Sequence, residues 1–166
     1  MSSSGVLVNP ECQSVFQRMA EGRKEFRYII FKIEDKEVVV EKTVTHEDMQ
    51  SQGDDYADNS KAAFEEFVND LKGVTDGFAD CRYAAFDFKF SIARQGAGKS
   101  KMDKLLFFQV CPDLATIKKK MVYASSASAI KAALGSGKII QMQVSDESEL
   151  SHNELLTKMT DKFSDN

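Results

Sequence analysis

Residues 104–110 constrain the fold more than any other segment, because the large apolar residues from Leu105 to Phe108 follow one another without a polar break. A strand with apolar side chains on both faces must be covered on both faces, so it belongs inside a sheet and not at its edge. With 166 residues, 42% of them hydrophobic, the chain is long enough for one continuous core. We therefore predict a single α/β (α+β) domain in which helices cover both faces of a mixed sheet.

The other segments alternate between helical and strand patterns. Asn9 and Pro10 open the first helix as an N-cap and a first-turn proline, and Ser151 with Glu154 forms a capping box for the last. The predicted helices cover residues 10–21, 60–73, 113 to about 125, 127–134 and 155–163. Ser60 is the expected cap of the second helix, and Pro112 with Asp113 is the expected start of the third. The predicted strands cover 28–33 and 38–40 as a hairpin, 81–92, 104–110 and 138–144, with a turn over 95–100.

Two segments lack such patterns. Residues 1–8 are expected to form a flexible N-terminal arm of the domain, which spans residues 1–166. Residues 46–59 contain five acidic side chains and no apolar period, so we expect a solvated, mobile acidic loop there. No repeat and no linker divides the chain.

Composition argues against several classes of protein. No apolar run approaches 18 residues and no basic segment precedes one at the start, so we expect neither a transmembrane segment nor a secretory signal. Cys12, Cys81 and Cys111 are odd in number and widely spaced, which predicts neither a disulfide framework nor a zinc site and favours the reducing cytoplasm. The net charge of −4 lacks the basic excess of a nucleic-acid binder.

The charge is unevenly distributed along the chain. Between Arg94 and Lys120 there are seven basic residues and two acidic ones, in a chain that is otherwise acidic. Such a basic district favours an acidic partner. One candidate partner is a phosphoinositide membrane, which would be bound by Lys99, Lys101, Lys104, Lys118, Lys119 and Lys120.

No combination of residues predicts a catalytic, metal or cofactor site. Residues 96–100 lack the spacing of a phosphate-binding loop and predict a hairpin turn. His46 and His152 are expected on the surface, and Asp54 and Asp55 have no apolar wall that would raise a carboxyl pKa. We therefore expect a protein that is not an enzyme and that uses no cofactor.

The segment from Ile117 to Met121 carries the strongest functional signal. At about 100° per residue, Ile117 and Met121 fall on one stripe of a helix, and Lys118 and Lys120 flank it. The opposite side is also mostly apolar, and Lys119 must extend past it to reach solvent. A helix with two apolar faces packs on its own sheet with one and on another molecule with the other. The alternative is that the stripe belongs to the core and the lysines form a solvated fringe.

Several short motifs in the chain belong together. They are Ser4-Gly5-Val6, residues 28–33 (YIIFKI), residues 83–88 (YAAFDF), Phe107-Phe108 with Cys111-Pro112-Asp113, and residues 120–126 (KMVYASS) before Ala129-Ile130-Lys131. In this order, over about residues 3–163, they resemble the ADF/cofilin family of actin-depolymerising proteins, and within it a nematode member of the non-muscle type. The resemblance implies a sheet of five or six strands between helices. It also implies an actin-binding protein of the cytoplasm and cytoskeleton that is itself a monomer.

The resemblance also implies how actin is bound. An apolar pair on the helix would enter a hydrophobic cleft of monomeric actin, while the flanking lysines meet acidic residues at its rim. Ser4 matches the regulatory phosphorylated serine of the family, and a phosphate there would add nearly two negative charges beside an acidic partner. The implied monomer-binding residues are Ile117, Lys118, Lys120 and Met121, with Ser4, Gly5 and Val6 as an extension.

The filament-binding side departs from the family pattern, which has two basic residues spaced by two at the start of strand 104–110. Lys104 matches the second, but Met102 occupies the place of the first, although Lys101 is nearby. In the C-terminal helix, Asp161 stands where a second cation is usual.

Replacing two cations on a surface that meets an acidic subunit weakens docking. We therefore expect a protein that binds monomers in preference to filaments, promotes filament disassembly, limits polymerisation and severs weakly. The filament-binding residues are then Lys101, Lys104, Lys158 and Lys162.

Overall fold

The computed structural model describes residues 5–21, 25–50, 55–94, 96, 98–135, 137 and 139–163. Its helices are α1 (Pro10–Ala20), α2 (Asp55–Asp58), α3 (Lys61–Val74), α4 (Ile117–Leu134) and α5 (His152–Phe163), with a 3-10 turn at Glu147–Glu149. The strands are β1 (Leu7–Val8), β2 (Phe26–Glu34), β3 (Glu37–Thr45), β4 (Arg82–Arg94), β5 (Gly98–Val110) and β6 (Ile140–Val144).

The six strands form one mixed sheet in the order β1-β3-β2-β4-β5-β6, which confirms the predicted fold class. Its centre is antiparallel, while the outer strands β1 and β6 run parallel to their neighbours. β5 lies between β4 and β6, so the continuously apolar segment is interior, as its pattern requires.

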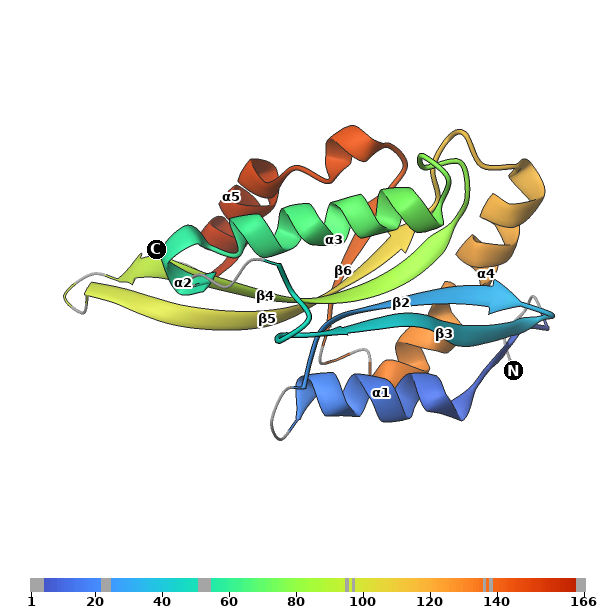
Figure 1. Ribbon diagram of the computed structural model, residues 1–166, viewed down its shortest axis with the longest axis horizontal. Helices are drawn as coiled ribbons and strands as arrows, with labels where there is room; N and C mark the ends of the chain where they lie inside the picture. The colour runs from blue at the N-terminus through green and yellow to red at the C-terminus, as the bar shows by residue number, and fades with distance from the viewer. Residues whose placement is uncertain are drawn as a thin grey trace.

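Helices cover both faces of the sheet (Figure 1). α3 and α5 pack on one face over a core that includes Phe64, Phe86 and Phe108. α1 and α4 pack on the other face, where Phe16 and Tyr83 are buried. Alternate side chains of β4 enter the two cores because successive residues of a strand point to opposite faces.

The N-terminal arm is shorter than predicted. Val6 is only 3% exposed, and β1 pairs in parallel with β3, where Leu7 N donates to Lys36 O at 3.0 Å. The prediction of a flexible arm over residues 1–8 is therefore wrong for residues 6–8, because the backbone of β3 offers free hydrogen-bonding groups there. Residues 1–4, including Ser4, lie outside the described residues.

The predicted acidic loop is also partly ordered. α2 occupies its last residues, and Asp55 forms an ion pair with the buried Arg27 at 2.5 Å. The prediction of a wholly solvated loop over 46–59 is thus wrong for 55–59, because a buried guanidinium requires a carboxylate partner. Asp54 lies outside the described residues.

Ser60 occupies the N-cap position of α3, as predicted, but its side chain makes no capping hydrogen bond, because it lies at a positive φ of 62° and its hydroxyl is used elsewhere. Beyond Phe86 this edge of β4 pairs with no strand of the described residues, and Ser60 Oγ binds it by donating to Lys89 O at 2.7 Å and accepting from Lys89 N at 2.9 Å. Asn59 Oδ1 accepts from Ser91 N at 2.9 Å, and Arg27 Nε donates to Asp87 O at 2.9 Å. We call Arg27, Asn59 and Ser60 the edge latch, since they replace a strand along β4.

Three further predictions need correction. α4 is one continuous helix whose N-cap is Thr116 and not Asp113, since a turn precedes it. β5 begins at Gly98 and not at residue 104, because pairing with β4 holds its polar half as a strand. His152 is half-buried beside Phe64, and its Nε2 lies 2.7 Å from Asn59 O, so it links α5 to the edge latch instead of lying on the surface.

Candidate docking surfaces

The apolar stripe at the start of α4 faces solvent. Ile117 is 73% exposed and Met121 is 66% exposed, whereas Tyr123 and Ile130 on the other side of the helix are buried. This exposure excludes the alternative in which the stripe belongs to the core. We call Ile117 and Met121 the ridge.

The cations that flank the ridge have no carboxylate within 4.0 Å in the described part of the chain. Lys118 is exposed and Lys120 is half-buried. Lys119 differs, because its Nζ lies 2.9 Å from Asp80 Oδ1, at the sheet side of the helix. Burial of Asp80 pushes its carboxyl pKa upward, but hydrogen bonds from Lys119 and Arg82 outweigh this effect and hold the pKa below its usual value.

α4 rests on a rigid platform. The Tyr83 hydroxyl donates to Tyr123 O, and the two rings lie 5.0 Å apart. The Tyr123 hydroxyl accepts from Ile33 N at 2.8 Å, which ties the helix to β2. Burial raises the pKa of both tyrosines, so both hydroxyls stay protonated at neutral pH. The ridge is therefore held in place by contacts that a partner would not disturb.

Sequence reasoning missed Leu114, which is 76% exposed and lies in the turn before α4. A helical pattern could not reveal it, because the residue precedes the helix. The available signal was a large apolar residue within a Pro-Asp turn, where small polar residues are usual.

The N-terminal segment approaches the same helix farther along. Val6, Leu7 and Val8 line a cavity of about 400 Å³ with small residues of α4, which are Ser128, Ala129, Ala132 and Ala133. Of the two predicted N-terminal site residues that the structure describes, Val6 is buried and Gly5 is exposed, at a positive φ of 77°. Residues 6–8 and the ridge thus lie along one helix, at different positions.

The predicted filament-binding lysines divide between two faces. Lys104 Nζ lies 4.3 Å from the centroid of the Phe163 ring, and Lys162 Nζ lies 5.9 Å from the same centroid. Lys158 lies on the same side of the sheet, with its Nζ 3.8 Å from Met142 Sδ. These three lysines therefore lie along α5 and its face of the sheet.

Lys101 points to the other face of β5, where its Nζ lies 5.0 Å from the centroid of the Tyr56 ring. The Tyr56 hydroxyl donates to Asp103, and Lys89 Nζ lies 3.5 Å from Asp103 Oδ2. Burial, reinforced by the bond to Asp103, raises the pKa of Tyr56. Lys101 cannot take the place of the cation missing beside Lys104, because the strand separates them.

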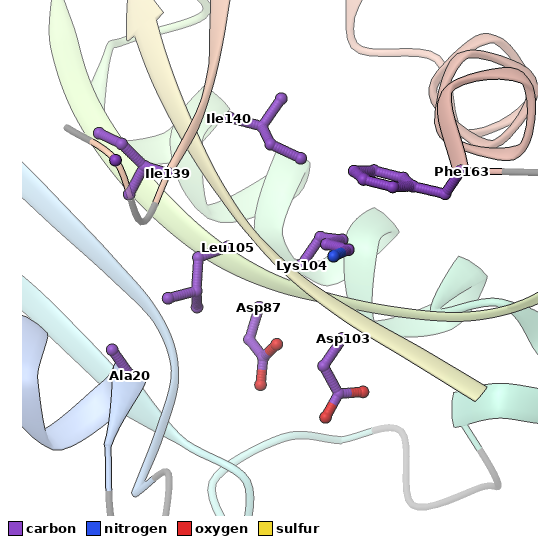
Figure 2. A pocket seen from close by; sticks show the side chains of 9 residues that line it. Ala20, Asp87, Asp103, Lys104, Leu105, Ile139, Ile140 and Phe163 are labelled. Carbon is purple, nitrogen blue, oxygen red and sulfur yellow. The ribbon is translucent and has the colours of Figure 1, made fainter.

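Figure 2 shows the two sides of β5 at a cavity of about 400 Å³, near the start of β6. Asp87 and Asp103 lie on one side of the strand, and Lys104 lies toward Phe163 on the other. Met102 packs against the core on the side of α5, whereas Asp161 is exposed. Neither of these residues supplies the positive charge that the family pattern has at its position.

The basic district is not a single patch. The tip of the β4–β5 hairpin, near Lys99 and Lys101, lies at one end of the molecule, and the start of α4 lies at the other (Figure 1).

The described residues include no group of three or more His, Cys, Asp or Glu side chains placed to hold a metal ion. None of their helices combines the length and the apolar character that crossing a membrane requires.

Comparison with known proteins decides the family. The model of the cofilin/tropomyosin-type actin-binding proteins matches residues 5–160. The chain belongs to this ADF/cofilin family. It is 64% identical over 154 residues to actin-depolymerizing factor 1, isoforms a/b, of Caenorhabditis elegans, covering 93% of this chain and 73% of that protein.

This ADF/cofilin protein is also similar to a more distant relative and to a solved structure. Cofilin of Schizosaccharomyces pombe is 37% identical, covering 98% of this chain and 100% of the relative. The solution structure of the ADF-like UNC-60A protein of C. elegans superposes with a TM-score of 0.82 at 62% identity, over 99% of both chains. The predicted resemblance to a nematode family member is thus confirmed, and the protein is an actin-binding protein of a family that regulates actin dynamics.

Proposed function

We propose that this protein binds monomeric actin through the ridge and its flanking lysines, promotes filament disassembly and limits polymerisation without catalytic activity. It acts in the cytoplasm, on the actin cytoskeleton. The observation that carries the proposal is the exposure of Ile117 and Met121 between two lysines that have no carboxylate partner within the described chain.

The geometry suits a cleft with an acidic rim. Ile117 and Met121 are already exposed, so their burial by a partner removes apolar surface from water with no unfolding of the helix. Lys118 and Lys120 need not break an ion pair of their own before they meet acidic residues. Both contributions favour a complex centred on the first two turns of α4.

Filament binding is the weaker activity in this proposal. Lys104, Lys158 and Lys162 form the side that would contact a filament, and Lys101 lies across the strand from them. Without cations at Met102 and Asp161, this surface attracts an acidic subunit less strongly, so severing is weak.

The test compares two pairs of lysines on one helix. Lys118→Ala with Lys120→Ala should lower the affinity for monomeric actin at least tenfold in a fluorescence titration, with an unchanged circular dichroism spectrum. The matched control is Lys119→Ala with Lys131→Ala, since these side chains contact Asp80 and Gln141 of the chain itself. Equal dissociation constants for the two double variants and the wild type would refute the proposal.

Phosphorylation of Ser4 would regulate this site. Ser4 precedes the exposed Gly5, and the following residues 6–8 line a cavity with α4, so a phosphate would place negative charge near a partner that is acidic. Ser4→Glu should weaken monomer binding and Ser4→Ala should not. Equal binding by all three forms would remove this proposed switch.

A further inference from the structure

The exposed apolar surface is concentrated in eight residues. The large hydrophobic side chains exposed among the described residues are Leu7, Leu114, Ile117 and Met121, so three of these four lie between positions 114 and 121. Leu114 is the most exposed of them, at 76%. Exposed apolar residues gathered in this way mark a surface that another molecule covers.

Leu114 is held on a rigid turn. On one side of it, Cys111 N donates to Val144 O and Asp113 N donates to Ser145 O, both at 2.9 Å. On the other side, Ala115 is 5% exposed and its N donates to Pro112 O at 3.0 Å. Because the turn is tied to the end of β6 and buried at both Pro112 and Ala115, ordering Leu114 in a complex costs little conformational entropy.

The turn also fixes Leu114 relative to the ridge. Thr116 caps α4, and its hydroxyl accepts from Lys119 N at 3.2 Å, so the helix begins directly after the turn. Leu114 therefore lies three residues before Ile117 in the chain, in the turn that leads directly into α4. Asp113 is the one acidic residue between positions 111 and 122, and three lysines follow Leu114 in the first turns of α4.

We propose that Leu114 is a third apolar anchor for monomeric actin, which extends the ridge beyond the N-terminus of α4. Its occupant is the same actin cleft that receives Ile117 and Met121, since the three exposed side chains lie within eight residues of the chain and α4 begins directly after the turn. This inference rests on the proposed function. It adds a residue that determines affinity, because a small polar residue at this turn would offer the cleft no apolar contact.

The experiment uses the full chain and monomeric actin. Leu114→Ser should raise the dissociation constant at least fivefold in a fluorescence titration, and Leu114→Met should restore binding to within about twofold of the wild type, because methionine conserves apolar volume. The melting temperature of both variants should equal that of the wild type, since an exposed side chain contributes little to packing.

A ridge variant, Ile117→Ser with Met121→Ser, separates this inference from the proposed function. If Leu114→Ser binds like the wild type while the ridge variant loses binding, Leu114 points away from actin and the inference fails alone. If both bind normally, the proposed function fails with it. A lower melting temperature for Leu114→Ser would also overturn the inference, because the residue would then serve the fold.

Discussion

The two candidate docking surfaces use their lysines in different ways. At the start of α4, Lys118 and Lys120 stand beside exposed apolar residues and have no carboxylate partner in the described chain. At the hairpin and α5, Lys104 and Lys101 lie over the aromatic rings of Phe163 and Tyr56. The large exposed hydrophobic residues of the described chain are all elsewhere, at α4 and β1.

This difference predicts two kinds of affinity. An apolar centre with a cationic rim gives a short-range contact that depends on shape and resists salt. A set of cations without such a centre attracts an acidic partner at longer range, and this attraction weakens within a Debye length of about 8 Å at physiological ionic strength. The molecule therefore combines one specific surface with one that is mainly electrostatic.

The two surfaces are also supported differently. α4 rests on buried tyrosines and a hydrophobic core, whereas the outer half of β4 is held by the polar edge latch of Arg27, Asn59 and Ser60. In a buried polar network each lost partner leaves another group unsatisfied, so the edge latch should be sensitive to single substitutions of its polar side chains.

Removal of the ridge should have the largest effect. Ile117→Ser with Met121→Ser is expected to weaken monomer binding by roughly a hundredfold, since buried apolar anchors dominate interface energies. The melting temperature should not fall, because both side chains are exposed. A titration at two salt concentrations measures the loss, and a loss smaller than that of Lys118→Ala with Lys120→Ala would contradict the apolar character of this surface.

Breaking the edge latch should have an intermediate effect, on stability. Ser60→Ala removes a buried hydroxyl that bonds Lys89 and Arg27, and should lower the free energy of unfolding by about 2 kcal/mol. Chemical denaturation measures this change. Amide hydrogen exchange should quicken at Lys89 and Ser91 and stay unchanged in α4, and uniform acceleration would show that the two surfaces are not independently supported.

Ser125→Ala is the matched control for the latch variant, because the Ser125 hydroxyl is exposed and donates only to carbonyls of its own helix. It should leave the free energy of unfolding within about 0.5 kcal/mol of the wild type.

Restoring charge on the filament side should have the smallest effect. Met102→Arg with Asp161→Arg is expected to increase cosedimentation with filaments about fivefold and to increase severing seen by microscopy, while monomer affinity stays constant. The gain should shrink as salt rises, since the site is exposed. A wild-type protein that already severs as fast as a typical cofilin would contradict the comparison between the two surfaces.

Periodicity in the sequence was sufficient to predict those features that depend on a single helix or strand. The spacing of Ile117 and Met121 predicted a two-faced helix, and the apolar run at 104–110 predicted an interior strand, because both patterns depend on local geometry alone. The capping box of Ser151 is likewise local, and Glu154 N donates to its hydroxyl oxygen at 3.3 Å.

Features that depend on distant partners were not predictable in this way. Lys99 to Asp103 look like a loop, yet they form a strand because β4 pairs with them, and only this extension shows that Lys101 and Lys104 point to opposite faces. Ser60 has the sequence context of a helix cap, but β4 engages its hydroxyl from a position 29 residues away. Propensity describes the nearest residues, and tertiary contacts override it.

The edge latch also limits self-association of this protein. A bare strand edge along the outer half of β4 would be a template on which a second copy of the chain could add its own strand, and further copies could follow. Ser60 and Asn59 occupy those backbone groups from within the molecule. A member of a family that depolymerises actin filaments is thereby prevented from forming a polymer of its own through β4.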